Sequence, residues 1–348
     1  MDIATLSMVM VAGLVVLLAI GVPLAFAAGS IAVVLAYANF GTGGLFLIGS
    51  RTAEFVASFE LVAVPMFVLM ASILERSGVA HDLYRAVHVW SGRFRGGVAV
   101  VTIFVAVILG ATTGIIGGEI VLLGLVALPQ MLKLGYDRKL AIGTITAGGS
   151  LGTMIPPSII LIFYGVAAEV SISNLFLATL MPGLMLAGLY IAYIAIRCGL
   201  NPSLGPPASG EDLAMPRREK LALLGKVALP LFVALSVLGS IYAGLASITE
   251  AAAVGVIGTL LAAIIRGKAS LPMLSGALIQ ALKTCGMVFW LVFATNALVG
   301  VYNLLGGITF ARELMSGLSD EPAIILATMI LVFVVLGFFL DWIGILFL

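Results

Sequence analysis

Three carboxylates lie within long apolar stretches of the 348-residue sequence: Glu119, Glu250 and Asp341. An ionisable side chain in such surroundings is costly to bury, so it usually belongs to an ion or substrate pathway or to a structural pair. Asp341 is the best single candidate for binding a cation, because the tip of a second hairpin is predicted there. Glu250 follows Thr249 at the expected start of a helix, where it can instead cap the helix and interact with its dipole. For Glu119 both roles stay open.

Small and hydroxyl-bearing residues surround the first of these carboxylates. The candidate binding residues of this cluster are Gly110, Thr112, Thr113, Gly114, Gly117, Gly118 and Glu119. Such a segment can turn backbone carbonyls and threonine hydroxyls toward a cation, as exposed backbone does in the broken helices of transporters. The alternative is close helix packing, since Gly114 and Gly118 form a GxxxG pair. Packing alone does not explain why basic residues flank both ends of the segment, so we favour a binding site.

A second cluster of the same kind follows. Its candidate residues are Gly152, Thr153, Pro156, Pro157 and Ser158. Tandem prolines cannot sit inside an unbroken helix without loss of backbone hydrogen bonds. The cluster is therefore either a simple proline kink or a loop that contributes to the same binding site.

These clusters must be carried by membrane helices. Hydrophobic residues make up 62% of the chain and charged residues only 9%, whereas roughly 25% of a soluble domain is charged. Apolar runs long enough to cross hydrocarbon recur at 4–20, 22–39, 57–74, 174–196, 227–246, 249–265 and 284–306. The runs are apolar on every side and do not alternate as barrel strands do. We expect an all-α polytopic membrane protein.

Several other classes of protein are excluded by composition and motif. The net charge of +1, without a long basic tract, gives no sign of nucleic-acid binding. Cys198 and Cys285 form no CxxC motif or Cys/His cluster, so neither a disulfide framework nor a zinc site is suggested. No GxxxxGK[ST] motif occurs, so the chain is not itself an ATP-driven motor. No convergent nucleophile and base are evident, so we expect no enzyme and no cofactor.

Basic residues orient the chain in the membrane. The polar, Pro- and Gly-rich segment 199–226 is a linker, and its four basic residues place it in the cytoplasm by the positive-inside rule. The N-terminus is then predicted to lie outside, on the periplasmic side of a bacterial membrane. The segment 97–132 has basic residues at both ends, and each of its halves has only about 12 to 14 residues, so we expect a re-entrant hairpin. A broken helix is expected at 140–169.

An internal repeat connects the two halves of the sequence. Residues 105–117 and 332–344 share six identities at an offset of 227, and a similar offset relates 25–29 to 251–255. A first repeat, 1–198, would start outside, and a second, 227–348, would start from the cytoplasmic linker. Repeats of inverted topology are typical of secondary transporters. At this offset, about 79 residues of the second repeat are expected to be missing after Leu348.

Four motifs together resemble a known family: residues 64–69 (VPMFVL), 110–119 (GATTGIIGGE), 152–158 (GTMIPPS) and 249–255 (TEAAAVG). They are similar to the large membrane subunit of TRAP (tripartite ATP-independent periplasmic) transporters, and the similarity covers the whole chain. The resemblance implies an elevator-type, sodium-coupled importer in the inner membrane. It also implies two partners, a small four-helix membrane subunit and a periplasmic substrate-binding protein.

Within this resemblance, segment 110–119 would be the first hairpin tip, 152–158 the first clamp loop and Asp341 the acidic residue of the second hairpin. Sodium would then be expected near oxygens of Thr112, Thr113, Thr153, Ser158 and Asp341. The first tip departs from the Ser-Gly-Ser-rich pattern of many relatives, and the expected second clamp loop lies beyond Leu348.

The resulting hypothesis is secondary active import of small organic acids, including dicarboxylates, by sodium symport. The substrate would be delivered by the binding protein. The alternative is an ion-coupled permease or channel that works without a binding protein.

Overall fold

The computed structural model describes residues 2–78, 82–87, 94–114, 118–207, 216–317, 321–338, 340 and 342–347. Throughout these ranges the regular structure is helical and contains no strand, which confirms the predicted all-α class. The chain divides into two compact units, Met1–Ser58 with Thr284–Leu348, and Phe59–Lys283. Each unit is described by itself below.

Long apolar helices dominate both units. Among the described residues, four helices are long and apolar enough to cross a membrane: α2 (Leu24–Val56), α9 (Ile172–Leu200), α12 (Ile248–Ile265) and α13 (Leu271–Leu304). Shorter apolar helices accompany them, including α1 (Ile3–Ala19) and α15 (Pro322–Leu336). This pattern confirms a polytopic membrane protein.

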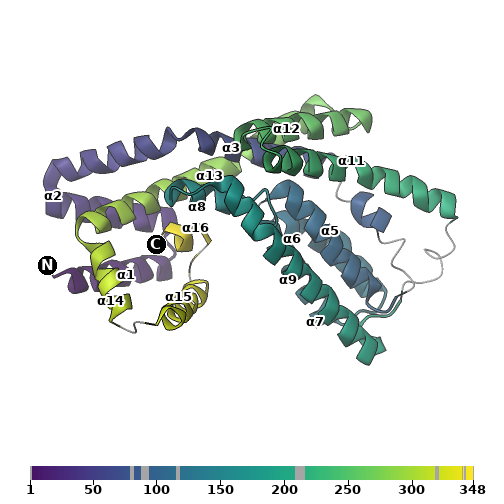
Figure 1. The fold of residues 1–348 in the computed structure, drawn as a ribbon, viewed down its shortest axis with the longest axis horizontal. Coiled ribbons are helices and arrows are strands. Elements are labelled where there is room, and N and C mark those ends of the chain that lie inside the picture. The colour runs from purple at the N-terminus through teal and green to yellow at the C-terminus, as the bar shows by residue number, and fades with distance from the viewer. Residues whose placement is uncertain are drawn as a thin grey trace. The chain divides into compact units, whose positions relative to one another are not determined.

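The first unit contains α1, α2, the second part of α13, α14 (Gly307–Ser316), α15 and α16 (Trp342–Phe347) (Figure 1). Its core forms where Leu14 of α1 meets Ala28 and Ala32 of α2 and Leu298 of α13. The small alanines allow the helices to approach closely, as is common in membranes.

One helical segment of this unit was not predicted. The run 22–39 corresponds to the first part of α2, and a second helical part follows it up to Val56. Within α2, Gly41 has φ 58° and ψ −145°, so the helix is broken there into residues 24–40 and 42–56. Side-chain-bearing residues rarely adopt this conformation, whereas glycine does so readily. The helical segment 42–56 is missing from the prediction because its apolar pattern is interrupted by glycines and polar residues.

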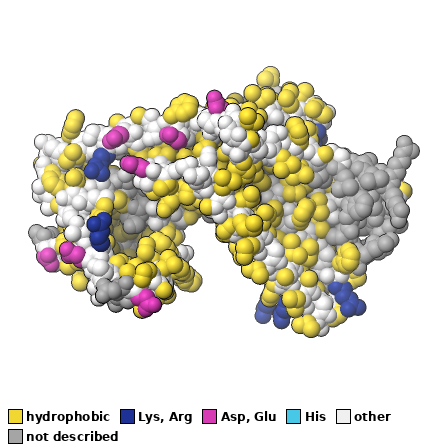
Figure 2. Space-filling model, viewed as in Figure 1, with side chains coloured by type: hydrophobic (Ala, Val, Ile, Leu, Met, Phe, Trp, Pro, Cys, Tyr) yellow, Lys and Arg dark blue, Asp and Glu magenta, His cyan; other side chains and the backbone are white. Residues whose placement is uncertain are grey.

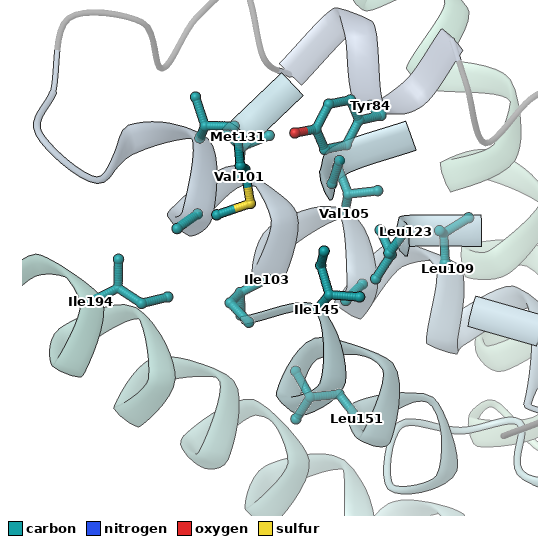
Figure 3. Packing of buried hydrophobic residues seen from close by; sticks show 14 of the residues in the cluster. Tyr84, Val101, Ile103, Val105, Leu109, Leu123, Met131, Ile145, Leu151 and Ile194 are labelled. Carbon is teal, nitrogen blue, oxygen red and sulfur yellow. The ribbon is translucent and has the colours of Figure 1, made fainter. Parts of the chain in front are cut away.

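The second unit is built around a bundle of four helices. These are α5 (Gly97–Thr113), α6 (Gly118–Lys133), α7 (Arg138–Ser150) and α9. Their core brings together Ile103, Leu123, Ile145 and Ile194, one from each helix (Figure 3). The unit also contains η1 (Phe59–Val62), α3 (Ala63–Arg76), a helical segment at 82–87, η2 (Leu151–Thr153), α8 (Ile159–Ala167), η3 (Pro202–Leu204), α11 (Arg217–Tyr242), α12 and the start of α13.

At one end of this bundle, the start of α5, the α6–α7 turn and the end of α9 meet. The backbone N–H of Val98 donates to the hydroxyl of Tyr136 at 3.2 Å, and that of Gly96 donates to the carbonyl of Gly205 at 2.8 Å. Burial raises the pKa of Tyr136 to about 12, so its phenol stays neutral at physiological pH. Helices α5 and α6 therefore form a hairpin whose two open ends lie together.

The two hairpin helices are longer than expected. Helix α5 has 17 residues and α6 has 16, against the expected 12 to 14 for each half. Helix α5 extends because Gly110 to Thr113 keep a helical backbone instead of opening at the first glycine. The depth that the hairpin reaches in a membrane stays a prediction.

The remainder of the second unit packs α3 against α12. Gly255 of α12 lies against the side chain of Met70, and Ile73 packs with Ala263. The guanidinium of Arg266 forms an ion pair with Asp82 at the end of α12. Helix α11 begins at Arg217, so part of the segment assigned to the linker is helical.

Candidate ion and substrate site

The C-terminal end of α5 lies against the non-helical stretch that separates η2 from α8. Gly114 ends α5 with φ 59°, and its carbonyl accepts a hydrogen bond from the N–H of Ile159, the first residue of α8, at 3.4 Å. A Cβ placed on Gly114 would overlap the carbonyl oxygen of Pro157 and lie 3.4 Å from the Cα of Ser158. The two predicted clusters are therefore joined backbone to backbone.

A second close approach occurs one helical turn before the tip. A Cβ on Gly110 would lie 2.8 Å from the Cα of Gly152, so the backbones of α5 and η2 touch. On its other side, Gly152 packs against the carboxylate of Glu119, which a Cβ at this position would overlap. Glu119 is 1% exposed. A buried carboxylate thus lies directly on the broken helix.

The hydroxyl groups in this region differ in how they are used. Thr112 Oγ1 donates to the carbonyl of Leu109 at 2.8 Å, and Thr153 Oγ1 donates to that of Ser150 at 2.9 Å. Ser158 is 0% exposed, and its Oγ has no hydrogen-bond partner among the described residues. Leaving a buried hydroxyl unpaired costs free energy, so such a group in a native protein calls for a ligand or a water.

The break in the helix also supplies backbone groups. Helix α7 ends at Ser150, and α8 begins at Ile159 after a buried cis peptide bond between Pro156 and Pro157. Ser158 occupies the N-cap position of α8 but makes no capping hydrogen bond. The first N–H groups of a helix are unsatisfied and carry a partial positive charge, which favours an anion. This stretch therefore offers carbonyl and hydroxyl oxygens to a cation and a helix N-terminus to a carboxylate.

Close helix packing, the alternative to a binding site, explains one of the glycines in this region. A Cβ on Gly148 would lie 3.2 Å from the Cβ of Ala106, so this glycine brings α7 close to α5. Gly118, in contrast, is exposed, and no atom of the described residues lies within 4 Å of a Cβ placed there, so these residues show no packing seam along the Gly114–Gly118 pair.

Three predicted site residues are described in part or not at all. Gly117 and Asp341 lie outside the described residues, and for Thr113 only the backbone, at the end of α5, is described. In the described ranges no group of three His, Cys, Asp or Glu side chains could hold a metal ion.

Glu250 lies elsewhere and has a structural role. The Ser247 Oγ accepts from the Glu250 N–H at 3.3 Å, and the Glu250 Oε2 accepts from the Ser247 N–H at 2.7 Å. This reciprocal pair is a capping box at the start of α12. The capping alternative is thus the one that the structure shows.

Sequence reasoning did not predict the contact between Glu119 and Gly152. The two residues belong to different motifs, and only the packing of α6 against α7 brings them together. The available signal was the glycine at position 152, since a residue without a side chain lets a neighbouring segment approach its backbone closely.

Comparison with known proteins agrees with this architecture. A profile of the family described as "Tripartite ATP-independent periplasmic transporter, DctM component" matches residues 11–348. The C4-dicarboxylate TRAP transporter large permease protein DctM of Vibrio cholerae is 31% identical over 203 residues, 58% of this chain and 44% of the relative. The ectoine TRAP transporter large permease protein TeaC of Halomonas elongata is 32% identical over 250 residues, 70% of this chain and 56% of the relative.

A further relative is the isethionate TRAP transporter permease protein DctMQ of Oleidesulfovibrio alaskensis. It is 25% identical over 333 residues, which cover 93% of this chain and 50% of the relative. The chain spans about half the length of these relatives. The family profile and the apolar helices agree, and the chain belongs to the large permease (DctM) family of TRAP transporters, as a multi-pass inner-membrane transport subunit rather than an enzyme.

Proposed function

We propose that the chain takes part in sodium-coupled import of small organic acids across the inner membrane. A periplasmic binding protein delivers the substrate, and a small four-helix membrane subunit completes the transporter. The single observation that carries the sodium part is the buried hydroxyl of Ser158, which has no hydrogen-bond partner among the described residues and belongs to a residue whose Cα lies beside Gly114.

The chemistry of the site supports a hard, weakly held cation. Sodium binds oxygen ligands, and exposed backbone carbonyls at helix breaks coordinate it in secondary transporters. Ser158 and Thr112 contribute hydroxyl oxygens, and the Pro157 carbonyl lies directly against Gly114. Thr153, Thr113 and Asp341 complete the set that we propose from the sequence.

A carboxylate-bearing substrate is supported by the adjacent helix end. The N-terminus of α8 provides unsatisfied N–H groups close to the proposed cation site. Two of the relatives are named for C4-dicarboxylates and for ectoine. Cation and carboxylate bound side by side would each lower the electrostatic cost of the other, which is a physical basis for coupled transport.

The proposed orientation places the N-terminus in the periplasm. The open end of the α5–α6 hairpin carries basic residues on both sides, which favours the cytoplasm, and the tip at Gly114 then points into the membrane. Inverted-topology repeats would place a second hairpin, containing Asp341, on the opposite side.

Uptake by proteoliposomes that contain the chain with its partner subunits tests this function. We expect uptake of a dicarboxylate to need an inward sodium gradient and the binding protein. Uptake that persists unchanged without a sodium gradient would reject the coupling. Uptake that needs sodium but no binding protein would instead support an independent ion-coupled permease.

A further inference from the structure

A groove of about 690 Å³ runs between α7 and α9, away from the residues of the candidate site. We call it the α7/α9 groove; its lining includes Lys139, Thr144 and Ala147 of α7 with Leu189, Tyr193 and Arg197 of α9. Leu189 is 63% exposed and Tyr193 is 55% exposed. Because α9 is long and apolar enough to cross the membrane, we expect exposed apolar side chains on it to face lipid.

The charges of the groove lie at one end. Lys139 is in the first turn of α7 and Arg197 is in the last turn of α9, and both are exposed. Neither forms an ion pair with any residue that the structure describes. The neighbouring carboxylate of Asp137 accepts a hydrogen bond from the N–H of Leu140 and caps α7. Figure 2 shows basic side chains gathered at this end of the bundle, next to a mainly hydrophobic surface.

A further polar group lies deeper in the groove. Thr144 is 4% exposed, and its Oγ1 has no hydrogen-bond partner among the described residues. It follows Lys139 by five residues along α7, a rise of about 7.5 Å. Beyond it the walls are formed by residues such as Ala147, Leu186 and Leu189. The groove thus presents two cations, then a hydroxyl donor, then an apolar channel.

We propose that the α7/α9 groove binds an anionic phospholipid. The phosphate would lie against Lys139 and Arg197, an ester carbonyl would accept a hydrogen bond from Thr144, and an acyl chain would follow the apolar wall. Basic pockets between membrane helices on the cytoplasmic side are suited to lipid headgroups of this charge. The order of groups along the groove matches the order of groups in a phospholipid, which a soluble anion or a neutral lipid would satisfy only in part.

The cations and the hydroxyl of the groove should contribute to lipid binding in two ways that can be measured separately. The two cations should set the preference for an anionic headgroup, whereas Thr144 should contribute to binding of any ester-linked phospholipid. Native mass spectrometry of the full chain in detergent, titrated with phosphatidylglycerol or phosphatidylcholine, measures both. We expect phosphatidylglycerol to bind on the order of tenfold more tightly, given two basic side chains at a membrane surface.

Substitutions then test each contribution. The double substitution Lys139→Gln with Arg197→Gln should abolish the preference for phosphatidylglycerol. Thr144→Val should lower the affinity for both lipids by a similar factor. The matched control is Arg138→Gln with Lys268→Gln, which removes the same charge from exposed positions outside the groove and should leave the preference intact. Equal affinity for the two lipids, or a preference that survives loss of both groove cations, would overturn the proposal.

Two further measurements identify the occupant. Glycerol phosphate should not displace phosphatidylglycerol, because it lacks the acyl chain; complete displacement would point to a soluble phosphate and reject a lipid. A photo-crosslinking amino acid in place of Leu189 should give lipid adducts in membranes. Adducts only with a protein, whether a second copy or another subunit, would likewise reject the proposal. Neither measurement depends on transport, so the outcome is independent of the proposed sodium coupling.

Discussion

The backbone N–H of Ile159 donates a hydrogen bond to the carbonyl of Gly114, with 3.4 Å between nitrogen and oxygen. This bond ties the end of α5 to the start of α8, and it satisfies one of the N–H groups that a helix N-terminus leaves unpaired. The hairpin tip and the broken helix therefore behave as one structural element. Substitutions in either segment should alter the proposed ion site.

Ser158→Ala removes one oxygen from that site. We expect the sodium concentration for half-maximal uptake to rise roughly tenfold, since losing a polar contact to a charged group costs about 1.5 kcal/mol. The Tm without sodium should stay unchanged or rise, because the Ser158 hydroxyl is buried without a partner among the described residues. The increase in Tm caused by sodium should shrink, because ligand binding stabilises the folded state.

Ser150→Ala is the matched control for this change. Ser150 is exposed, and its hydroxyl donates to the carbonyl of Ala147 in its own helix at 2.8 Å. Its loss should leave the sodium dependence of uptake and of Tm as in the parent protein. If uptake by the Ser158→Ala variant depended on sodium concentration in the same way as uptake by the parent protein does, the Ser158 hydroxyl would not be part of the ion site.

Gly114→Ala should distort the hairpin tip. The residue has φ 59°, and a Cβ would overlap the Pro157 carbonyl oxygen, so strain and a clash act together. A strained backbone of this kind costs about 1 to 3 kcal/mol, so both Tm and uptake should fall. Gly118→Ala is the control, because no described residue has an atom within 4 Å of a Cβ there. Equal Tm values for the two variants would contradict the described tip.

Gly152→Ala should displace the Glu119 carboxylate, because a Cβ at position 152 would occupy its place. The loss of Tm should be smaller when Glu119→Ala is already present, since the space is then free. Residues in contact show such coupling, whereas independent residues give additive effects. Thermal unfolding of the two single variants and the double variant measures it. Additive losses would mean that the two residues do not touch.

Glu250→Ala should destabilise α12 without altering ion coupling. The carboxylate belongs to the capping box with Ser247 and accepts from the Ser247 N–H, so its loss should lower the Tm. Ser247→Ala should lower the stability to a similar extent. The double variant should lose less stability than the two single variants lose in sum. Thermal unfolding checks the stability, and uptake at varied sodium checks the coupling. A shifted sodium dependence would instead make Glu250 part of the ion pathway.

The helical class and most membrane-crossing runs could be predicted because hydrophobicity along the chain reports directly on burial in lipid. The clusters around Gly114 and Ser158 were also visible, since glycine and proline have strong local effects on a helix. Their direct contact was not predictable, because it depends on how α5, α6 and α7 pack. The same holds for the α7/α9 groove, whose Lys139 and Arg197 look like ordinary flanking charges in the sequence.

One helical segment was missed for a local reason. Residues 42–56 of α2 follow the break at Gly41, and their glycines and polar residues interrupt the apolar signal. For Glu250 a cap was among the predicted roles, and the structure shows it. Its distance to Ser247 along the chain is the spacing of a capping box, which local chemistry explains fully.

The break at Gly41 sets how this part of the protein fits its bilayer. A straight helix of 33 residues would be about 50 Å long, well beyond the hydrocarbon thickness of about 30 Å. Such a rod would have to tilt steeply or thicken the surrounding lipid, each at an energetic cost. With the break, residues 24–40 form a rod of about 25 Å. One glycine therefore limits the first helical rod to a length that fits within the membrane.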